Sequence, residues 1–244
     1  MRIFTDAANI EEKMIRITDK GDIRHMIKVM RMREGDTVDV SDSSQWEYRA
    51  EILSIDEEQV LLSILDKQKF AREPELAVTL FQGIPKAGKM ETIIQKCVEL
   101  GVHSIVPVFM DRTVVVEKGN FSKKLERWQK VSDEAVKQCK RGMIPEICPQ
   151  LRFGEMTAQL SDYDLILFPY ENEDNFSIKD CLRGLSEKPK TVAIVIGPEG
   201  GFSDKEAAAM DEAGAARVTL GKTILRTETA GMAALSMTMY ELEL

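Results

Sequence analysis

Residues 194–206 read IVIGPEGGFSDKE, and this stretch decides the class of fold. A β-branched run leads into a turn with three glycines and a proline, and Ser203 and Glu206 then form an S-x-x-E capping box that predicts the start of a helix. A second turn, LGKTILRTETAG at 220–231, also leads into an expected helix. Glycine-rich turns between a strand and a helix are typical of α/β proteins whose backbone approaches a ligand at the carboxyl ends of the strands.

Beyond residue 76 the pattern alternates between strands and helices. Helical periodicity predicts helices over 90–100, from Ser122 onward, and from near Thr227 to the C-terminus. Such alternation indicates a mostly parallel sheet with helices on both faces. Apolar runs predict its strands at 76–83, 104–109, 163–168, 191–196 and 216–220.

Before residue 70 the pattern is mostly that of strands. Runs at 37–40, 47–55 and 59–65 are separated by short polar turns, which predicts a small antiparallel barrel. One helix interrupts it, with Asp22 expected as its cap and Gly35 as its stop. Its buried stripe is expected to be Ile23, Met26, Ile27 and Met30. We therefore predict a β domain over residues 1–72 and an α/β domain over residues 73–244.

Composition excludes several classes of protein. The first residues, MRIFTDAANIEEK, carry charges where a signal peptide needs an apolar run, and the longest apolar runs are too short to span a bilayer. We therefore expect a cytoplasmic protein with no membrane partner. Four cysteines without a CxxC pair and only two histidines argue against a metal site, so we expect none.

The charge is unevenly distributed in a chain whose net charge is −8. Residues 13–33 hold seven basic residues against two acids, and residues 118–141 hold eight against three. Two readings remain open for each segment. The cations form an ordinary solvated helix face, or they gather on one face as a footprint for the phosphates of a nucleic acid.

The glycine turns do not match the known phosphate-binding patterns. LGKT resembles the end of a Walker A loop, but Ala216 stands where its first glycine belongs. The spacing of Gly197, Gly200 and Gly201 does not fit the Rossmann fingerprint, and the only charged residue within GPEGG is Glu199. The glycines serve either a tight turn alone or a ligand held by backbone and apolar contacts. S-adenosylmethionine (SAM), which has no phosphate, fits the second reading.

These motifs resemble the RsmE family of the SPOUT methyltransferases, which act on 16S rRNA. The resemblance is carried by IGPEGGFS and LGKTILRTETA, and also by RIF (2–4), HMIKVMRMREGD (25–36), KAGKMETIIQKCVELGVHSIVP (86–107), Arg112 and WQKVSDEAVKQCKR (128–141). The chain departs from the family at Arg24, where a histidine is usual, and at SDSSQ (41–45), which replaces a glycine-containing turn.

The resemblance implies a PUA-like RNA-binding barrel followed by a SPOUT domain with a C-terminal trefoil knot, in a homodimer. The loops near 168–171, 197–201 and 220–227 would form the knot and hold SAM. The residues expected to bind this cofactor are Phe168, Pro169, Tyr170, Glu171, Ile196, Gly197, Pro198, Gly200, Gly201, Leu220, Gly221, Ile224, Leu225 and Thr227.

The family reaction implies roles for further residues. Methyl transfer to N3 of a uridine requires loss of the N3 proton and stabilisation of the resulting anion. Arg226 is expected to hold a uracil oxygen, although a phosphate clamp or an ion pair with Glu228 fits it equally well. Glu199 and Glu228 are candidate bases, and Glu228 also suits the first turn of a helix. RNA contacts are expected at Arg24, His25, Lys28, Arg31, Lys86, Lys89 and Arg112.

The resemblance therefore implies a SAM-dependent methyltransferase that converts one uridine of 16S rRNA (position 1498 in the usual rRNA numbering) to 3-methyluridine in the 30S subunit. Two alternatives stay open from the residues. One is a SAM-binding or RNA-binding factor without catalysis, and the other is a SPOUT methyltransferase that acts on tRNA.

Overall fold

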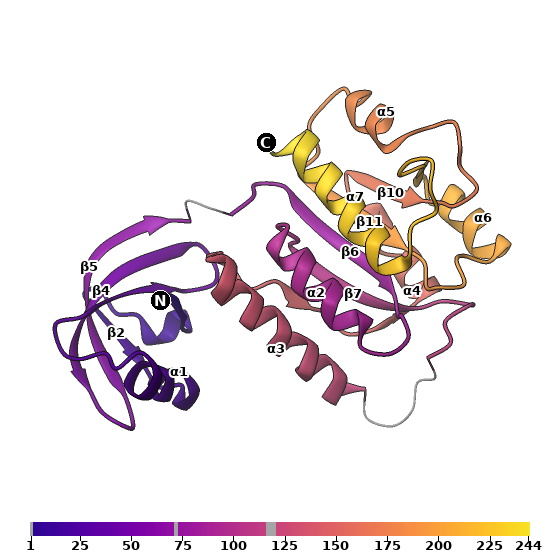
Figure 1. Ribbon diagram of the computed structural model, residues 1–244. Helices are drawn as coiled ribbons and strands as arrows, with labels where there is room; N and C mark the ends of the chain where they lie inside the picture. The colour runs from indigo at the N-terminus through magenta and orange to yellow at the C-terminus, as the bar shows by residue number, and fades with distance from the viewer. Residues whose placement is uncertain (1, 71–72, 116–120) are drawn as a thin grey trace. The chain divides into compact units, whose positions relative to one another are not determined.

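The computed structural model describes residues 2–70, 73–115 and 121–244 of the chain (Figure 1). The chain divides into two compact units. The first comprises Met1–Glu73 and Val136–Ile144, and the second comprises Pro74–Ala135 and Pro145–Leu244. No pattern in the sequence predicted that residues 136–144 would belong to the first unit.

The first unit is built on a five-stranded sheet with the order β1-β3-β4-β5-β2. All neighbouring strands are antiparallel except β1 and β3, which are parallel. Register shifts in β4 between Arg49 and Ala50 and between Ile52 and Ser54 bend the sheet, as β-bulges do. The predicted small β domain is confirmed, with β1 and β2 at the two edges of the sheet. Its strands are β1 (Arg2–Phe4), β2 (Met14–Ile17), β3 (Thr37–Ser41), β4 (Trp46–Ile55) and β5 (Val60–Lys69).

The short segments of this unit include the expected helix, but with different ends. After a single turn η1 (Ala7–Asn9), α1 (Lys20–Arg24) continues directly into the π-helical η2 (His25–Val29). The prediction that Asp22 caps the helix is wrong, because the Asp19 carboxylate accepts the Asp22 backbone N–H at 2.8 Å. The prediction that Gly35 ends it is also wrong, because the helical conformation ends after Val29.

The second unit is built on a seven-stranded sheet, and every pairing in it is parallel. The order is β12-β10-β11-β6-β7-β8, and β9 also pairs with β7. The parallel sheet predicted from the sequence is therefore confirmed, but the two-residue strands β8 and β9 were not predicted, being too short to show a pattern. The strands are β6 (Ala77–Gly83), β7 (Ser104–Phe109), β8 (Glu146–Ile147), β9 (Leu151–Arg152), β10 (Leu165–Pro169), β11 (Thr191–Ile196) and β12 (Ala216–Val218).

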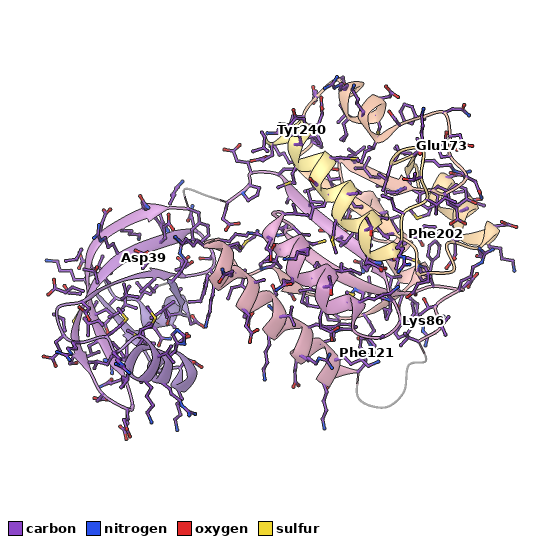
Figure 2. All side chains as sticks on the ribbon, in the orientation of Figure 1. Asp39, Lys86, Phe121, Glu173, Phe202 and Tyr240 are labelled. Carbon is purple, nitrogen blue, oxygen red and sulfur yellow. The ribbon has the colours of Figure 1, made fainter. Side chains whose placement is uncertain are left out.

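Helices cover both faces of this sheet because its strands alternate their side chains between the faces. On one face, Phe81 packs in a cluster with Met156 of α4, Met210 of α6 and Phe202. Phe202, which Figure 2 labels, lies just before α6. On the other, α7 packs on α2, β6 and β11. The apolar residues that give the 90–100 segment its helical periodicity are buried on one side of α2, and these are Met90, Ile93, Ile94, Cys97 and Val98. The helices are α2 (Lys89–Glu99), α3 (Ser122–Cys139), α4 (Phe153–Thr157), η3 (Leu160–Asp162), α5 (Ile178–Arg183), α6 (Asp204–Glu212) and α7 (Thr227–Leu242).

The strand order has a switch point between β6 and β11. From β6 the chain builds β7 and β8 on one side, and then it returns to build β10, β11 and β12 on the other. Ligands of open α/β sheets bind beyond the carboxyl ends of the strands at such a point. The GPEGG turn directly follows β11, so the fold places it there.

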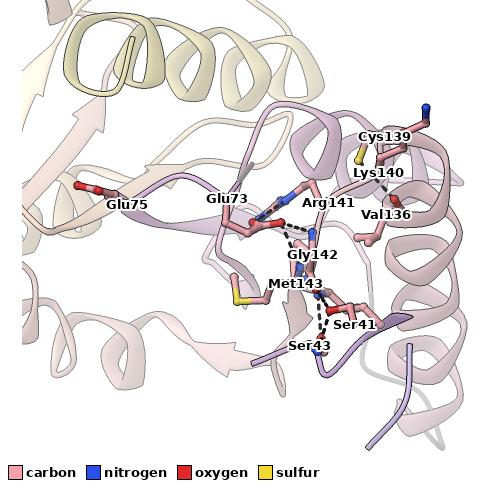
Figure 3. A network of polar contacts seen from close by, with 12 residues as sticks. Ser41, Ser43, Glu73, Glu75, Val136, Cys139, Lys140, Arg141, Gly142 and Met143 are labelled. Carbon is pink, nitrogen blue, oxygen red and sulfur yellow. Dashed lines mark hydrogen bonds and ion pairs between the residues drawn. The ribbon is translucent and has the colours of Figure 1, made fainter. Parts of the chain in front are cut away.

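A polar network ties residues 136–144 into the first unit (Figure 3). The Glu73 carboxylate pairs with the Arg141 guanidinium at 2.9 Å and accepts the backbone N–H groups of Gly142 at 2.5 Å and Met143 at 3.0 Å. The side chains of Glu73 and Arg141 are only 10% and 7% exposed. The Ser41 hydroxyl adds a hydrogen bond to the Gly142 carbonyl.

Replacing Glu73 by alanine is expected to lower the free energy of unfolding by about 3–5 kcal/mol, because the buried Arg141 guanidinium and the N–H groups of Gly142 and Met143 would lose the Glu73 carboxylate. Urea denaturation followed by circular dichroism measures this. Glu75→Ala is the matched control, since Glu75 is exposed and its change should stay within about 0.5 kcal/mol. Equal effects of the two substitutions would show that the buried pair does not hold this segment.

Candidate active site

A cavity of about 420 Å³ lies at the carboxyl ends of β10, β11 and β12 in the second unit. Its volume is within the range of small-molecule sites. Three segments form most of its wall. They follow the three strands and include residues 169–171, 196–199 and 219–227.

The hydroxyl of Thr227 joins three of the surrounding elements. It donates a hydrogen bond to the Gly197 carbonyl at 2.6 Å and accepts one from the Gln82 amide at 2.9 Å. The same Gln82 amide donates to the Gly83 carbonyl at 3.0 Å. Thr227 and Gln82 are both buried, so water does not compete for these bonds. The end of β6, the turn after β11 and the start of α7 are therefore fixed to one another.

At two positions around this turn another segment passes so close to the backbone that only glycine fits. A Cβ atom on Gly83 would lie 2.5 Å from the Pro198 nitrogen, so any side chain there would push the turn off the end of β6. Gly201 has a φ of +68°, and a Cβ atom on it would lie 3.0 Å from the Glu171 carboxylate. The glycines therefore let one loop pass directly over another.

A lysine lies between two carboxylates at the cavity. The Lys89 ammonium is 3.2 Å from the carboxylate of Glu199 and 3.2 Å from that of Glu228, and these contacts raise the pKa of Lys89. Partial burial raises the pKa of Glu199, but hydrogen bonds from the Lys86 backbone N–H and from Lys89 outweigh it, so its pKa is lowered. Burial likewise raises the pKa of Glu228 and the contact with Lys89 lowers it. The net effect is a lowered pKa for Glu228 as well. Both acids are therefore ionised at neutral pH.

The lining suits a ligand that is partly apolar and carries charges of both signs. Ile196, Phe202, Leu220 and Leu225 supply apolar wall, and the turn around Gly197 supplies backbone groups. The charged members of the lining are Lys89, Glu171, Asp174, Glu199, Lys222 and Arg226. SAM fits this set, because it joins an apolar adenine to a sulfonium, an ammonium and a carboxylate.

Comparison with known proteins decides the family. A family model described as an RNA methyltransferase domain matches residues 72–239, and one described as an RNA methyltransferase PUA domain matches residues 17–65. The chain is 33% identical to the ribosomal RNA small subunit methyltransferase E of Bacillus subtilis (strain 168), over 91% of this chain and 89% of that protein. The chain belongs to the ribosomal RNA small subunit methyltransferase E family.

Solved structures agree with this placement. The small subunit methyltransferase E of Neisseria gonorrhoeae, bound to SAM, superposes with a TM-score of 0.85 at 27% identity, over 98% of this chain and 96% of that one. A methyltransferase of Legionella pneumophila, also solved with SAM, superposes with a TM-score of 0.84 at 30% identity, over the same shares of the two chains. The SPOUT-type α/β fold and the PUA-like domain expected from the sequence are confirmed.

Of the predicted cofactor residues, twelve line the cavity and two do not. Phe168 is fully buried in the core beneath Tyr170, whose ring stacks on it at 5.2 Å. Gly200 faces Arg112 instead, since a Cβ atom on it would lie 2.9 Å from the Arg112 Cβ. The twelve are Pro169, Tyr170, Glu171, Ile196, Gly197, Pro198, Gly201, Leu220, Gly221, Ile224, Leu225 and Thr227.

The predicted catalytic residues gather at one side of the cavity. Arg226 and Glu199 line it, and Glu228 reaches it through its ion pair with Lys89. Arg226 is the N-cap residue of α7, an exposed position from which its guanidinium is available to a substrate.

The residues expected to contact RNA fall into three groups. Lys89 lines the cavity but already pairs with two carboxylates, and Arg112 donates to the Gly200 carbonyl at 2.9 Å. Lys86 is exposed beside this region (Figure 2). The other four belong to the first unit, where all are exposed, and these are Arg24, His25, Lys28 and Arg31.

Sequence reasoning missed several residues of the site. Gln82 lies behind the cavity. No sequence pattern indicated its role, because its hydrogen-bond partner Thr227 is far away in the sequence. Lys222 was considered only as part of a phosphate loop, although the turn that contains it was singled out. The lining residues that were not among the predicted site residues are Asp174, Phe202, Thr219, Lys222, Thr223 and Ala230.

The described part of the chain holds neither a candidate membrane span nor a candidate metal site. No helix there combines the length and apolar character needed to cross a membrane. No group of three or more His, Cys, Asp or Glu side chains is placed to hold a metal ion among the same residues.

Substituting Thr227 by valine is expected to lower the free energy of unfolding by about 1–3 kcal/mol, because the buried Gly197 carbonyl and Gln82 amide lose their shared partner. The turn after β11 would loosen, and we expect the affinity for SAM to fall by about tenfold, equivalent to about 1.4 kcal/mol. Thermal unfolding and isothermal titration calorimetry with SAM measure the two effects.

Thr238→Val is the matched control, because Thr238 is also buried on α7 but bonds only to the Ala234 carbonyl of its own helix. It should leave the affinity for SAM unchanged. Thr227→Ser, which keeps the hydroxyl, should bind SAM like the wild type. If Thr227→Val also binds SAM normally, the hydroxyl does not shape the cavity.

Proposed function

We propose that this chain is a SAM-dependent methyltransferase that methylates N3 of a specific uridine of 16S rRNA in the small ribosomal subunit. The observation that carries the proposal is the cavity at the switch point, walled by three loops, with Arg226 at the start of α7 and the Lys89 cluster on its lining. The name of the B. subtilis relative and the SAM-bound structures from N. gonorrhoeae and L. pneumophila support it.

The proposed reaction divides the work between the cofactor and the protein. When bound, SAM supplies a methyl group activated by a positively charged sulfonium. The apolar lining and the backbone of the Gly197 turn hold the adenosyl part, and the surrounding acids offset the positive charge of the ligand. A positioned donor and acceptor convert a bimolecular reaction into an effectively unimolecular one.

Loss of the N3 proton is the step on which the residues of the site act. A general base works best when its pKa is near the working pH, but the pKa values of Glu199 and Glu228 are lowered. Both carboxylates are therefore weak bases. Arg226 takes the more important role in this proposal. Its guanidinium holds a uracil oxygen, stabilises the anion and so lowers the pKa of N3.

The three loops of the cavity are also the proposed site of a trefoil knot. The hydrogen bonds from Thr227 to Gly197 and from Gln82 to Thr227 support it, because they fasten the start of α7 against the turn after β11. Since the proposed substrate is the small ribosomal subunit, the cytoplasm is the proposed location.

A homodimer formed through α7 is the final part of the proposal. Met237 and Tyr240 are 38% and 69% exposed, and Leu244 just beyond the helix is 97% exposed. Met237 and Tyr240 are three residues apart and therefore lie on one side of α7, where Figure 2 labels Tyr240. Ile224, in the loop before α7, is 81% exposed. Large apolar side chains of this kind are typical of an interface between subunits.

Tritiated methyl transfer from SAM tests the function. Small subunits that lack the modification, free 16S rRNA and bulk tRNA are offered in parallel, and the labelled nucleoside is identified by mass spectrometry. We expect 3-methyluridine in the small subunit. Arg226→Ala should lower the rate by about 10²–10³-fold, the cost of removing one stabilising donor, with SAM binding retained. Label in tRNA alone, or SAM binding without any label, would each contradict the proposal.

The pH dependence of the single-turnover rate tests the role given to the carboxylates. Because both are already ionised, we expect the rate to rise about tenfold per unit between about pH 6 and pH 8, following ionisation of N3. Rapid-quench measurements on saturated enzyme show this. A rate that stays constant across this range would assign the proton to a protein base instead.

Sedimentation velocity tests the homodimer. The wild-type chain should sediment as a dimer, and Tyr240→Asp should shift it toward the monomer, because a buried unpaired charge is costly at an interface. Leu65→Asp is the control, since Leu65 is a comparably exposed residue, at 54%, in the other unit. A wild-type chain that sediments as a monomer at micromolar concentration would contradict the proposal.

A further inference from the structure

The first unit carries an exposed apolar tip at the end of its helical segment. Val29, the last residue of η2, is 64% exposed, and Met30, which follows it, is 48% exposed. The preceding turn is anchored, because Ile23 and Met26 are almost fully buried in the core of the unit. The tip is therefore held out by a rigid base.

The backbone at the tip departs from ordinary helix geometry. The Met30 N–H bonds to the His25 carbonyl at 3.0 Å, which closes a wider π turn, and the Met32 N–H bonds to the Met26 carbonyl at 3.0 Å. Arg31 has a φ of +54°, which lies in the left-handed region that residues other than glycine rarely adopt. Isolated π turns occur frequently at functional sites, and strained backbone persists where its surroundings impose it.

Cations surround the tip without partners of opposite charge. Among the described residues, no ion pair involves Arg24, Lys28 or Arg31. The acid closest to them in the sequence, Asp22, is buried and pairs with Lys137 at 2.7 Å. The segment from residue 20 to residue 35 holds five basic residues, and Glu34 is its only exposed acid.

We propose that Val29 and Met30 contact the face of an unstacked base in the RNA substrate, while Arg24, Lys28 and Arg31 hold the flanking phosphates. This rests on the proposed function, which makes an RNA the substrate. Nucleic acid presents regularly spaced negative charges beside apolar base faces, and the tip presents cations beside apolar side chains. Base faces are covered in a continuous duplex, so the contact requires a loop, a bulge or a kinked step.

An apolar protein surface is the competing partner for this tip. Binding to an apolar surface would not require cations around the tip. Burying Arg24, Lys28 and Arg31 against such a surface without partners of opposite charge would cost free energy. The charge complementarity therefore favours RNA.

The salt dependence of methylation separates the two kinds of contact. Phosphate contacts make the apparent affinity depend on salt, whereas contacts with a base face do not. For Met30→Ser and Val29→Ser we expect KM for small subunits to rise by about tenfold, because each variant loses an apolar contact with the base, with kcat and the salt slope unchanged. For Lys28→Ala we expect the slope of log KM against log salt to fall by about one. Leu65→Ser is the matched control, since Leu65 is 54% exposed on β5, and it should leave every parameter unchanged.

Three outcomes would overturn the inference, and each differs from failure of the proposed function. An unchanged KM in both serine variants would remove the contact. A changed salt slope in these variants would show that they act through the neighbouring cations. A raised KM for small subunits with unchanged binding to a free 16S rRNA transcript would assign the tip to a ribosomal protein. If the wild-type chain labels neither particle nor transcript, the proposed function itself fails. Thermal unfolding verifies that the variants fold, as expected for exposed positions.

Discussion

The shape of the candidate active site depends on one buried hydroxyl. Thr227 stands between the Gly197 carbonyl and the Gln82 amide, and so it connects residues that are far apart in the sequence but meet at one end of the sheet. The constraint extends to the neighbouring residues. Gly83 must lack a side chain for the turn to cross the end of β6, and a Cβ atom on Gly231 would lie 3.2 Å from Oε1 of the Gln82 side chain. A site built in this way gives its backbone groups fixed positions before any ligand arrives.

The charges at the cavity are arranged so that one cation serves two acids. Lys89 offsets Glu199 and Glu228 together, which leaves this group of three with a net charge of −1 at neutral pH. That charge favours a cationic sulfonium more than its neutral product. It would oppose a second anion, and a uracil anion therefore needs a separate cation. Arg226 meets this need, because it lines the cavity and no ion pair of the described residues involves it.

The sequence predicted what short-range patterns determine. The capping box at Ser203 and Glu206, the buried stripe of α2 and the parallel strands all follow from spacings within about ten residues, and the structure has them. Features that depend on distant partners were missed. The Glu73–Arg141 pair and the bond between Gln82 and Thr227 join residues whose separation in sequence carries no periodic signal. The ends of the helical segment α1–η2 were missed for a related reason. The Asp19 cap before α1 depends on one side-chain hydrogen bond, and the turn after η2 depends on the positive φ of Arg31.

The net charge of −8 and a polyanionic substrate are compatible because electrostatic fields in water are short-ranged. At physiological ionic strength the screening length is about 8 Å, so a phosphate at the tip of η2 is affected mainly by the cations beside it. Apart from the exposed Glu34, the acids nearest in sequence are engaged locally. Asp22 pairs with Lys137, the Asp19 carboxylate accepts the Asp22 N–H, and the Asp36 carboxylate accepts the Arg33 N–H. Capping bonds and one ion pair thus leave a local excess of positive charge on an acidic protein, and the unpaired cations of that segment are available to the substrate.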